Sequence, residues 1–230
     1  MPVIELERVS HRYTDSPGAP LVLDEVTLRL DEPRVGVIGA NGSGKSTFAR
    51  LLNGLVIPGE GTVRVAGLDT RTRGRDVRRR VGFCFTDPDA QIVMPTVRED
   101  VAFGLRRRGL SKAEVRERVD GALARYGLAD LADHPAHLLS GGQKQLLALT
   151  SVLVTEPALL VLDEPTTLLD LRNAAAVARV LADLPQQVVL VTHHLDLLTA
   201  FDRVLVFDRA RVVHDGTPRD AIAHYRELMG

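Results

Sequence analysis

The stretch GANGSGKST at residues 39–47 has the residue types and spacing of a phosphate-binding loop. It follows the apolar run at residues 35–38 and precedes a helix-like segment at residues 48–55. Glycines let successive backbone N–H groups turn toward an anion, because a Cβ would hold the chain away from the phosphates. The positive end of the following helix adds its dipole. The residues predicted to surround the phosphates are Gly39, Ala40, Asn41, Gly42, Ser43, Gly44, Lys45, Ser46 and Thr47.

Two adjacent carboxylates, Asp163 and Glu164, come directly after the apolar run at residues 158–162. Such a run is typical of a buried parallel strand, and ligands bind at the carboxyl edge of an open α/β sheet. Two acids in a loop can also be merely solvent-exposed, but the phosphate loop favours a catalytic pair. We therefore expect Asp163 to hold Mg²⁺, through its waters, and Glu164 to act as general base on an attacking water.

Within the phosphate loop, two side chains have separate predicted roles. Lys45 reaches the β- and γ-phosphates as a mobile charge, and the Ser46 hydroxyl suits Mg²⁺. Together with Asp163 and Glu164, these residues predict a nucleoside triphosphatase that uses Mg²⁺.

A second glycine-containing segment starts a helix-like run at residues 144–154. Ser140 is predicted to cap that helix, and the two glycines after it give close access to the backbone. Alone, the sequence SGGQ is typical of a flexible loop. Between a phosphate loop and a carboxylate pair, it indicates a second anion site made of Ser140, Gly141, Gly142 and Gln143.

Composition limits the protein class. The chain has 230 residues, 45% of them hydrophobic, and a formal net charge of −1. This argues against disorder and against a generally basic surface, so we expect no nucleic-acid partner. The single cysteine, Cys84, lies in an apolar run and is expected to be buried. No run is long enough to span a membrane, and no leader is apparent, so we expect the chain in the cytoplasm.

The remaining segments predict an α/β fold with a further layer and a helical lobe. Alternating residues at 3–8, 26–30 and 62–66 predict an antiparallel β layer. Residues 71–80 hold six arginines, which indicates a solvated face or, less favoured, contact with lipid headgroups or a partner. Capping-box patterns begin at Thr96 and Ser111, so residues 96–139 are predicted to form an all-helical lobe inserted in one domain. Parallel strands are predicted at residues 158–162 and 188–192, then a final hairpin and a helix near Pro218.

In the order and type of these motifs, the chain resembles the ATP-binding cassette (ABC) family. The resemblance implies the P-loop NTPase nucleotide-binding fold over the full length. It also implies a head-to-tail dimer, in which Ser140 to Gln143 of one subunit face the phosphate loop of another and contact its ATP in trans. Tyr13 falls where an aromatic ring stacks on adenine in that family, Asp170 matches a loop that contacts the opposite subunit, and His193 matches the histidine that contacts the γ-phosphate and orients the water. From the sequence, Tyr13 can also be an ordinary surface residue, and Asp170 can equally cap the following helix.

One position departs from the family pattern. Where relatives have a glutamine that reaches Mg²⁺ and couples the site to the membrane partner, this chain has Thr86, which is too short for that reach. A water can bridge the gap, Gln91 can take part of the role, or coupling is altered. We favour a water bridge with retained but slower hydrolysis, because Lys45, Glu164 and His193 are intact.

The segment from residue 81 to residue 104 resembles the energy-coupling-factor (ECF) importers of vitamins and metal ions, and the short chain is most similar to the biotin type. This implies an ATPase at the cytoplasmic face of the membrane. Its partners would be a second ATPase subunit (an identical chain or a paralogue), a transmembrane coupling protein and a small substrate-capture membrane protein. The alternatives are the ATPase of another ABC transporter, a soluble ABC ATPase without a transport role, and a regulatory module that does not hydrolyse ATP.

Overall fold

The computed structural model describes residues 1–14, 16, 18–106, 108–167 and 169–230, and the chain divides into two compact units. The first, here called the core unit, comprises Met1–Val81, Ala158–Glu164 and Gln186–Gly230. The second, the helical unit, comprises Gly82–Pro157 and Pro165–Pro185. Part of the predicted loop at residues 16–20 and Leu168 of the predicted dimer loop lie outside the described residues.

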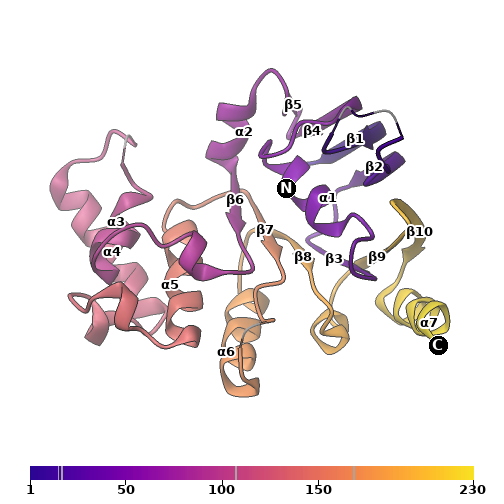
Figure 1. Ribbon diagram of the computed structural model, residues 1–230. Coiled ribbons are helices and arrows are strands. Elements are labelled where there is room, and N and C mark those ends of the chain that lie inside the picture. Colours follow the sequence, from indigo (N-terminus) through magenta and orange to yellow (C-terminus); the bar gives the residue numbers. More distant parts are fainter. Residues whose placement is uncertain (15, 17, 107, 168) are drawn as a thin grey trace. The chain divides into compact units, whose positions relative to one another are not determined.

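In the part of the core unit that the structure describes, the strands form two sheets (Figure 1). The antiparallel layer has the order β2-β1-β4-β5 and pairs Ile4 with both Leu30 and Val65. Its strands are β1 (Ile4–His11), β2 (Leu23–Leu30), β4 (Glu60–Val65) and β5 (Leu68–Asp69). The alternating burial of β2 explains the alternating sequence pattern, because one face packs on the core and the other meets solvent. The predicted antiparallel layer is confirmed.

The second sheet carries the predicted nucleotide loop, and within the core unit its order is β10-β9-β3-β8-β7. Its strands are β3 (Arg34–Gly39), β7 (Leu159–Asp163), β8 (Gln187–Val191), β9 (Arg203–Asp208) and β10 (Arg211–Gly216). β3 pairs in parallel with β8 and β9, and β7 pairs in parallel with β8, whereas β10 closes the edge as an antiparallel hairpin. Every residue of β7 and β8 is buried, as their continuous apolar sequence predicts. Parallel pairing places the carboxyl ends of β3, β7 and β8 at one edge.

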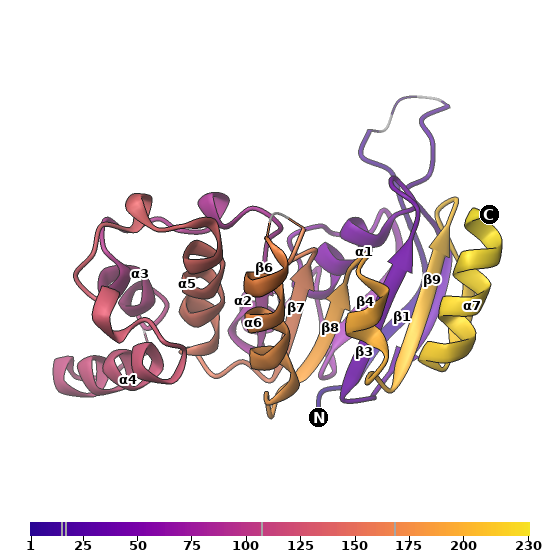
Figure 2. The ribbon, with the colours of Figure 1, turned by 90° about the horizontal axis from the view of Figure 1, so that it is seen from below.

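Among the described residues, the core unit is completed by three α-helices: α1 (Lys45–Leu52), α2 (Gly74–Arg80) and α7 (Pro218–Met229). Figure 2 shows α7 beside β9, where the helix packs through Ala221 and Ile222. Residues 74–80 of the arginine-rich run form α2, and all six arginines of the run are exposed at the surface.

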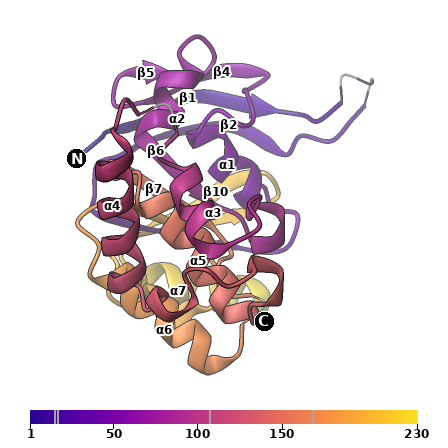
Figure 3. The ribbon, with the colours of Figure 1, turned by 90° about the vertical axis from the view of Figure 1, so that its left-hand side faces the viewer.

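The helical unit contains α3 (Val97–Phe103), α4 (Lys112–Arg125), α5 (Gly141–Leu153) and α6 (Leu171–Ala182). The unit also contains the 3₁₀ turn η1 (Pro88–Ala90) and most of the short strand β6 (Val81–Cys84), whose first residue, Val81, belongs to the core unit. Both predicted capping boxes are present at Thr96 and Ser111, and Cys84 is buried as predicted. Figure 3 shows α3, α4 and α5, which pack on one another within this unit.

The helical unit is wider than the predicted lobe at residues 96–139. The reason is its hydrophobic core, which Leu147 and Val154 of the α5 segment share with Val101 of α3 and Leu123 of α4. The core therefore needs α5, and the unit extends through residue 157.

Candidate active site

The phosphate loop follows β3, and its backbone requires glycine at two positions for steric reasons. A Cβ on Gly39 would lie 2.1 Å from the carbonyl oxygen of Phe207, and one on Gly44 would lie 2.4 Å from that of Val22. Gly42 has open space around it but a φ of +77°. At positive φ a Cβ meets the backbone, so glycine is favoured there as well. The loop therefore has a backbone conformation that non-glycine residues cannot adopt at these positions without strain.

Lys45 is the first residue of α1 and is 8% exposed. Its Nζ donates to the carbonyl oxygens of Gly39 (2.8 Å) and Ala40 (2.9 Å), so the amine lies over the loop. Burial lowers the pKa of Lys45, while the nearby charges of Glu164 and Asp163 raise it. A buried ammonium at a helix start and inside a glycine loop is suited to bind phosphate.

Ser43 supplies a further polar group to the loop. Its hydroxyl oxygen is buried and, among the described residues, has no hydrogen-bond partner. A buried hydroxyl without a partner is costly, and a phosphate oxygen would satisfy it. The residues of the loop therefore fit a phosphate-bearing ligand.

Ser46 and Asp163 meet at the predicted magnesium site. The Ser46 hydroxyl donates to Asp163 Oδ1 at 2.8 Å, and Asp163 is 1% exposed. Burial raises the pKa of Asp163, which the Ser46 hydrogen bond and the charge of Arg50 oppose. A hydroxyl and one carboxylate are hard oxygen donors of the kind that hold Mg²⁺ together with substrate phosphates. In the described part of the chain no cluster of three or more acidic, histidine or cysteine side chains forms a metal site.

Glu164 lies one residue beyond β7, with a positive φ of 54°. Its backbone N–H donates to the carbonyl of Val191 (2.9 Å), which fixes the residue beyond the edge of the sheet. Glu164 Oε2 lies 2.8 Å from Nδ1 of His193 and accepts from the backbone N–H of His193 at 3.3 Å. A non-glycine residue at positive φ is strained, and such strain gathers at functional sites. The carboxylate–imidazole pair is the arrangement of a base and the group that orients it.

Strand register explains why these side chains meet. Val191 of β8 pairs with Val37 of β3 and with Asp163 of β7. The residues after those three positions therefore emerge at one edge of the sheet, where the phosphate loop starts. The pair Lys45–Ser46, the pair Asp163–Glu164 and His193 lie far apart along the chain, and the core unit brings these three segments together.

Sequence reasoning missed Arg50 of α1, whose guanidinium lies 3.7 Å from Asp163 Oδ2. Arg50 is four residues after Ser46, so both side chains project from the same face of α1 toward Asp163. The spacing of four residues between Ser46 and Arg50 is the sequence feature that could have identified Arg50 as part of the site.

Tyr13 is 57% exposed, and its hydroxyl lies 2.9 Å from the hydroxyl of Thr47. The ring also makes an edge contact with His11 at a centroid distance of 5.0 Å. The exposed ring stands beside the last residue of the phosphate loop. Its role as a platform for adenine stays a prediction.

In the helical unit, Ser140 caps α5 through a complete capping box with Gln143. The Gln143 side chain accepts from the Ser140 N–H (2.9 Å). Gly141 faces open space, whereas a Cβ on Gly142 would lie 2.2 Å from the side chain of Asn173 on α6. Gly142 is thus needed for helix packing, and Gly141 is the glycine that leaves the backbone open to a ligand.

Asp170 caps α6, because its side chain accepts from the N–H of Asn173 at 2.8 Å. The predicted helix-capping role is present, and the contact with a second subunit stays a prediction.

Both polar atoms of the Gln91 side-chain amide are used within the helical unit: Oε1 accepts from Phe85 N–H (3.2 Å) and Nε2 donates to the carbonyl of Ala148 (2.9 Å). These bonds favour a structural role for Gln91 over the magnesium role considered from the sequence. Thr86 lies two residues beyond the end of β6 in the same unit, and its role stays a prediction.

Known proteins resemble the chain over its whole length. The sequence is 53% identical over 211 residues to a biotin transport ATP-binding protein, BioM, of Rhizobium etli, covering 92% of this chain and 94% of that protein. It is 39% identical over 234 residues to an energy-coupling factor transporter ATP-binding protein, EcfA1, of Caldanaerobacter subterraneus, covering 98% and 84%. Among solved structures, cbiO1 of Clostridium perfringens, described as part of the ABC transporter complex cbiONQ, superposes with a TM-score of 0.84 at 32% identity, covering 98% and 92%.

None of the helices in the described residues is both long and apolar enough to cross a membrane. The family profile described as "ABC transporter" matches residues 23–167, which include the phosphate loop, Ser140 to Gln143 and the carboxylate pair. The chain therefore belongs to the ABC transporter family, as one of its ATP-hydrolysing subunits.

Proposed function

We propose that this chain is the ATPase subunit of an energy-coupling-factor importer for a vitamin or metal ion, with biotin the favoured substrate. The observation that carries the chemistry is the convergence of the phosphate loop, the Ser46–Asp163 pair and the Glu164–His193 pair at one sheet edge. The named relatives, one for biotin transport and one an energy-coupling factor ATPase, support the transport branch.

The chemistry proposed for this edge is hydrolysis of the γ-phosphoryl group of ATP. The loop N–H groups and Lys45 bind the phosphates, Glu164 accepts the proton of the attacking water, and His193 orients Glu164 and contacts the γ-phosphate. Ser46 and Asp163 would hold Mg²⁺, which supplies charge neutralisation on the phosphates when bound. Little covalent chemistry is required, so positioning and charge carry the rate.

A second subunit, identical or paralogous, would present its own Ser140 to Gln143 to the bound ATP. The open backbone at Gly141 and the helix start behind it suit a phosphate oxygen. ATP would then favour the closed dimer and hydrolysis would release it.

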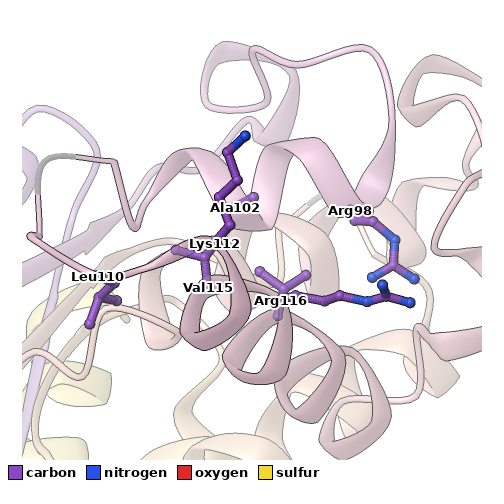
Figure 4. Close-up of a pocket in the computed structure, with 7 residues that line it drawn as sticks. Arg98, Ala102, Leu110, Lys112, Val115 and Arg116 are labelled. Carbon is purple, nitrogen blue, oxygen red and sulfur yellow. The ribbon is translucent and has the colours of Figure 1, made fainter.

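The helical unit offers a surface for a transmembrane coupling protein. A pocket of about 290 Å³ lies between α3 and α4, and Figure 4 shows side chains that line it. Its apolar lining comes from Ala102, Leu110, Val115 and Val119, and its basic lining from Arg98, Lys112 and Arg116. The pocket would take an apolar side chain of a partner helix. The protein would thus sit peripherally at the cytoplasmic face of the membrane.

The test is recovery of the tagged chain from detergent-solubilised membranes of its own source, with mass spectrometry of the proteins and small molecules that accompany it. We expect one larger and one small multi-span protein, and a bound vitamin or metal ion would name the substrate. Val115→Asp should lose both membrane proteins, while Ala124→Asp, on an exposed position of α4, should keep them. Recovery of a soluble chain alone, or with ribosomes or DNA, would contradict the transport role.

A further inference from the structure

The carboxylate of Asp100 is buried in the helical unit and belongs to no part of the site described above. It lies in the first turn of α3 and is 3% exposed. Its Oδ1 accepts from the backbone N–H groups of Val93 (2.9 Å) and Met94 (3.1 Å), and its Oδ2 accepts from the Ser151 hydroxyl on α5 (2.8 Å). None of the basic side chains within the described ranges pairs with it. The charge is therefore held by neutral donors alone, and each of those bonds is charge-assisted.

Val93 and Met94 belong to the loop at residues 85–94, and two more contacts attach this loop to α5. Lys144 Nζ donates to both carboxylate oxygens of Asp89, at 2.7 and 3.0 Å, and Gln91 donates to the carbonyl of Ala148 at 2.9 Å. The partners on α5 are residues 144, 148 and 151, a spacing of four and three that lies on one face of a helix. Their partners in the loop, residues 89, 91 and 93–94, come in the same order along the chain, the last of them through Asp100. The loop thus runs along α5 and is attached to it at three successive turns.

The three attachments differ in strength. The side chain of Asp89 is 62% exposed, so its ion pair with Lys144 is screened by solvent. Gln91 makes single bonds between neutral groups. Asp100 is buried, makes three charge-assisted bonds, and joins the loop, α3 and α5 at one point. Its loss would leave two backbone N–H groups and a hydroxyl without their partner.

We propose that Asp100 is a positioning residue that fixes the loop at residues 85–94 on α5, so that the loop and Ser140 to Gln143, at the start of α5, move as one body. The inference rests on the proposed function, in which a membrane protein docks on the helical unit. A displacement imposed on the loop reaches the start of α5 only if the attachment is stiff. Asp100 supplies that stiffness from inside the unit, whereas solvent screens and weakens the Lys144–Asp89 ion pair.

The first arm of the test measures the attachment itself. Amide hydrogen exchange of Val93 and Met94 is followed by NMR or residue-resolved mass spectrometry in the full chain. Asp100→Ala should speed exchange of both amides by at least about tenfold, because each loses a charge-assisted bond. Asp100→Asn should exchange faster than the parent but more slowly than Asp100→Ala, because its carbonyl still accepts from both amides and its NH₂ donates to the Ser151 oxygen, but without the charge. The matched control is Asp130→Ala, an exposed carboxylate of the same unit.

The second arm measures ATP hydrolysis by the complex with its membrane partners. Asp100→Ala should lower kcat of the complex about tenfold with the KM for ATP unchanged, and Asp100→Asn should restore part of the lost kcat. Ser151→Ala cuts only the link to α5, so it should lower kcat while Val93 and Met94 still exchange slowly. That variant keeps the loop bonds and serves if Asp100→Ala does not fold.

Parental exchange in Asp100→Ala, parental kcat in Ser151→Ala, or an Asn variant as defective as the Ala variant would each overturn the role of Asp100. A parent chain that associates with no membrane protein would instead contradict the proposed function. In that case the exchange arm would still decide whether Asp100 holds the loop.

Discussion

Glu164→Gln should abolish turnover while ATP binding remains. The substitution keeps the shape of the side chain and one oxygen that can accept from His193, which lies at 2.8 Å through Nδ1 and at 3.3 Å through its backbone N–H. It removes only the basic lone pair and the negative charge. A positioned general base contributes about 10² to 10⁴ in rate, so the barrier should rise by about 3 to 5 kcal/mol.

The assay is steady-state phosphate release at saturating ATP and Mg²⁺, beside a direct measurement of ATP affinity. We expect kcat to fall by at least about a hundredfold and the Kd for ATP to change by less than about threefold. Because ATP stays uncleaved, size-exclusion chromatography with ATP should show a trapped dimer. The matched control is Glu156→Gln, since Glu156 is exposed and also has a positive φ, of 52°.

If Glu164→Gln hydrolysed ATP within tenfold of the parent rate, Glu164 would not be the base, because loss of a base has to cost more than that. If affinity for ATP fell as steeply as kcat, the carboxylate would act in binding. A normal result for Glu156→Gln excludes a general effect of amide substitution at such a backbone position.

Three further predictions concern the loop, the cysteine and the unusual threonine. Gly39→Ala should destabilise the protein by more than about 2 kcal/mol, because its Cβ would lie 2.1 Å from the Phe207 carbonyl, whereas Gly42→Ala, with open space, should cost about 1 kcal/mol of backbone strain; equal denaturant midpoints for the two variants would contradict the steric argument. Burial raises the pKa of Cys84 from 9.0 to about 12, so its thiol should react with iodoacetamide at pH 8 only after denaturation. Because the folded-state pKa lies above the unfolded one, the stability contribution of this thiol is complete below pH 9 and is lost as the pH rises toward 12, and Cys84→Ala should show a smaller loss of stability over that range. Thr86→Gln should raise the turnover rate and change its dependence on Mg²⁺; unchanged values in a Mg²⁺ titration of ATPase activity would refute the water bridge inferred for Thr86.

Much of the fold follows from local sequence pattern. The continuous apolar runs give the buried strands β7 and β8, and Thr96, Ser111, Ser140 and Asp170 each cap the helix that their sequence predicts. These are short-range effects, since a capping side chain bonds to a backbone group three residues away. The phosphate loop is local in the same sense, because its glycines specify its backbone conformation.

Residue types and spacing are enough to predict nucleotide chemistry for this chain, because the glycines, Lys45, Ser46 and the carboxylate pair are informative without any structure. The distant groups that complete the site become visible only when the strands and helices are packed. The guanidinium of Arg50 at Asp163 and the pairing of His193 with Glu164 depend on strand register. The close packing of Gly142 on Asn173, the use of Gln91 by α5 and the burial of Asp100 depend on how helices of one unit meet. Contacts between residues far apart in the chain are set by the packing of whole elements, and no local pattern encodes them.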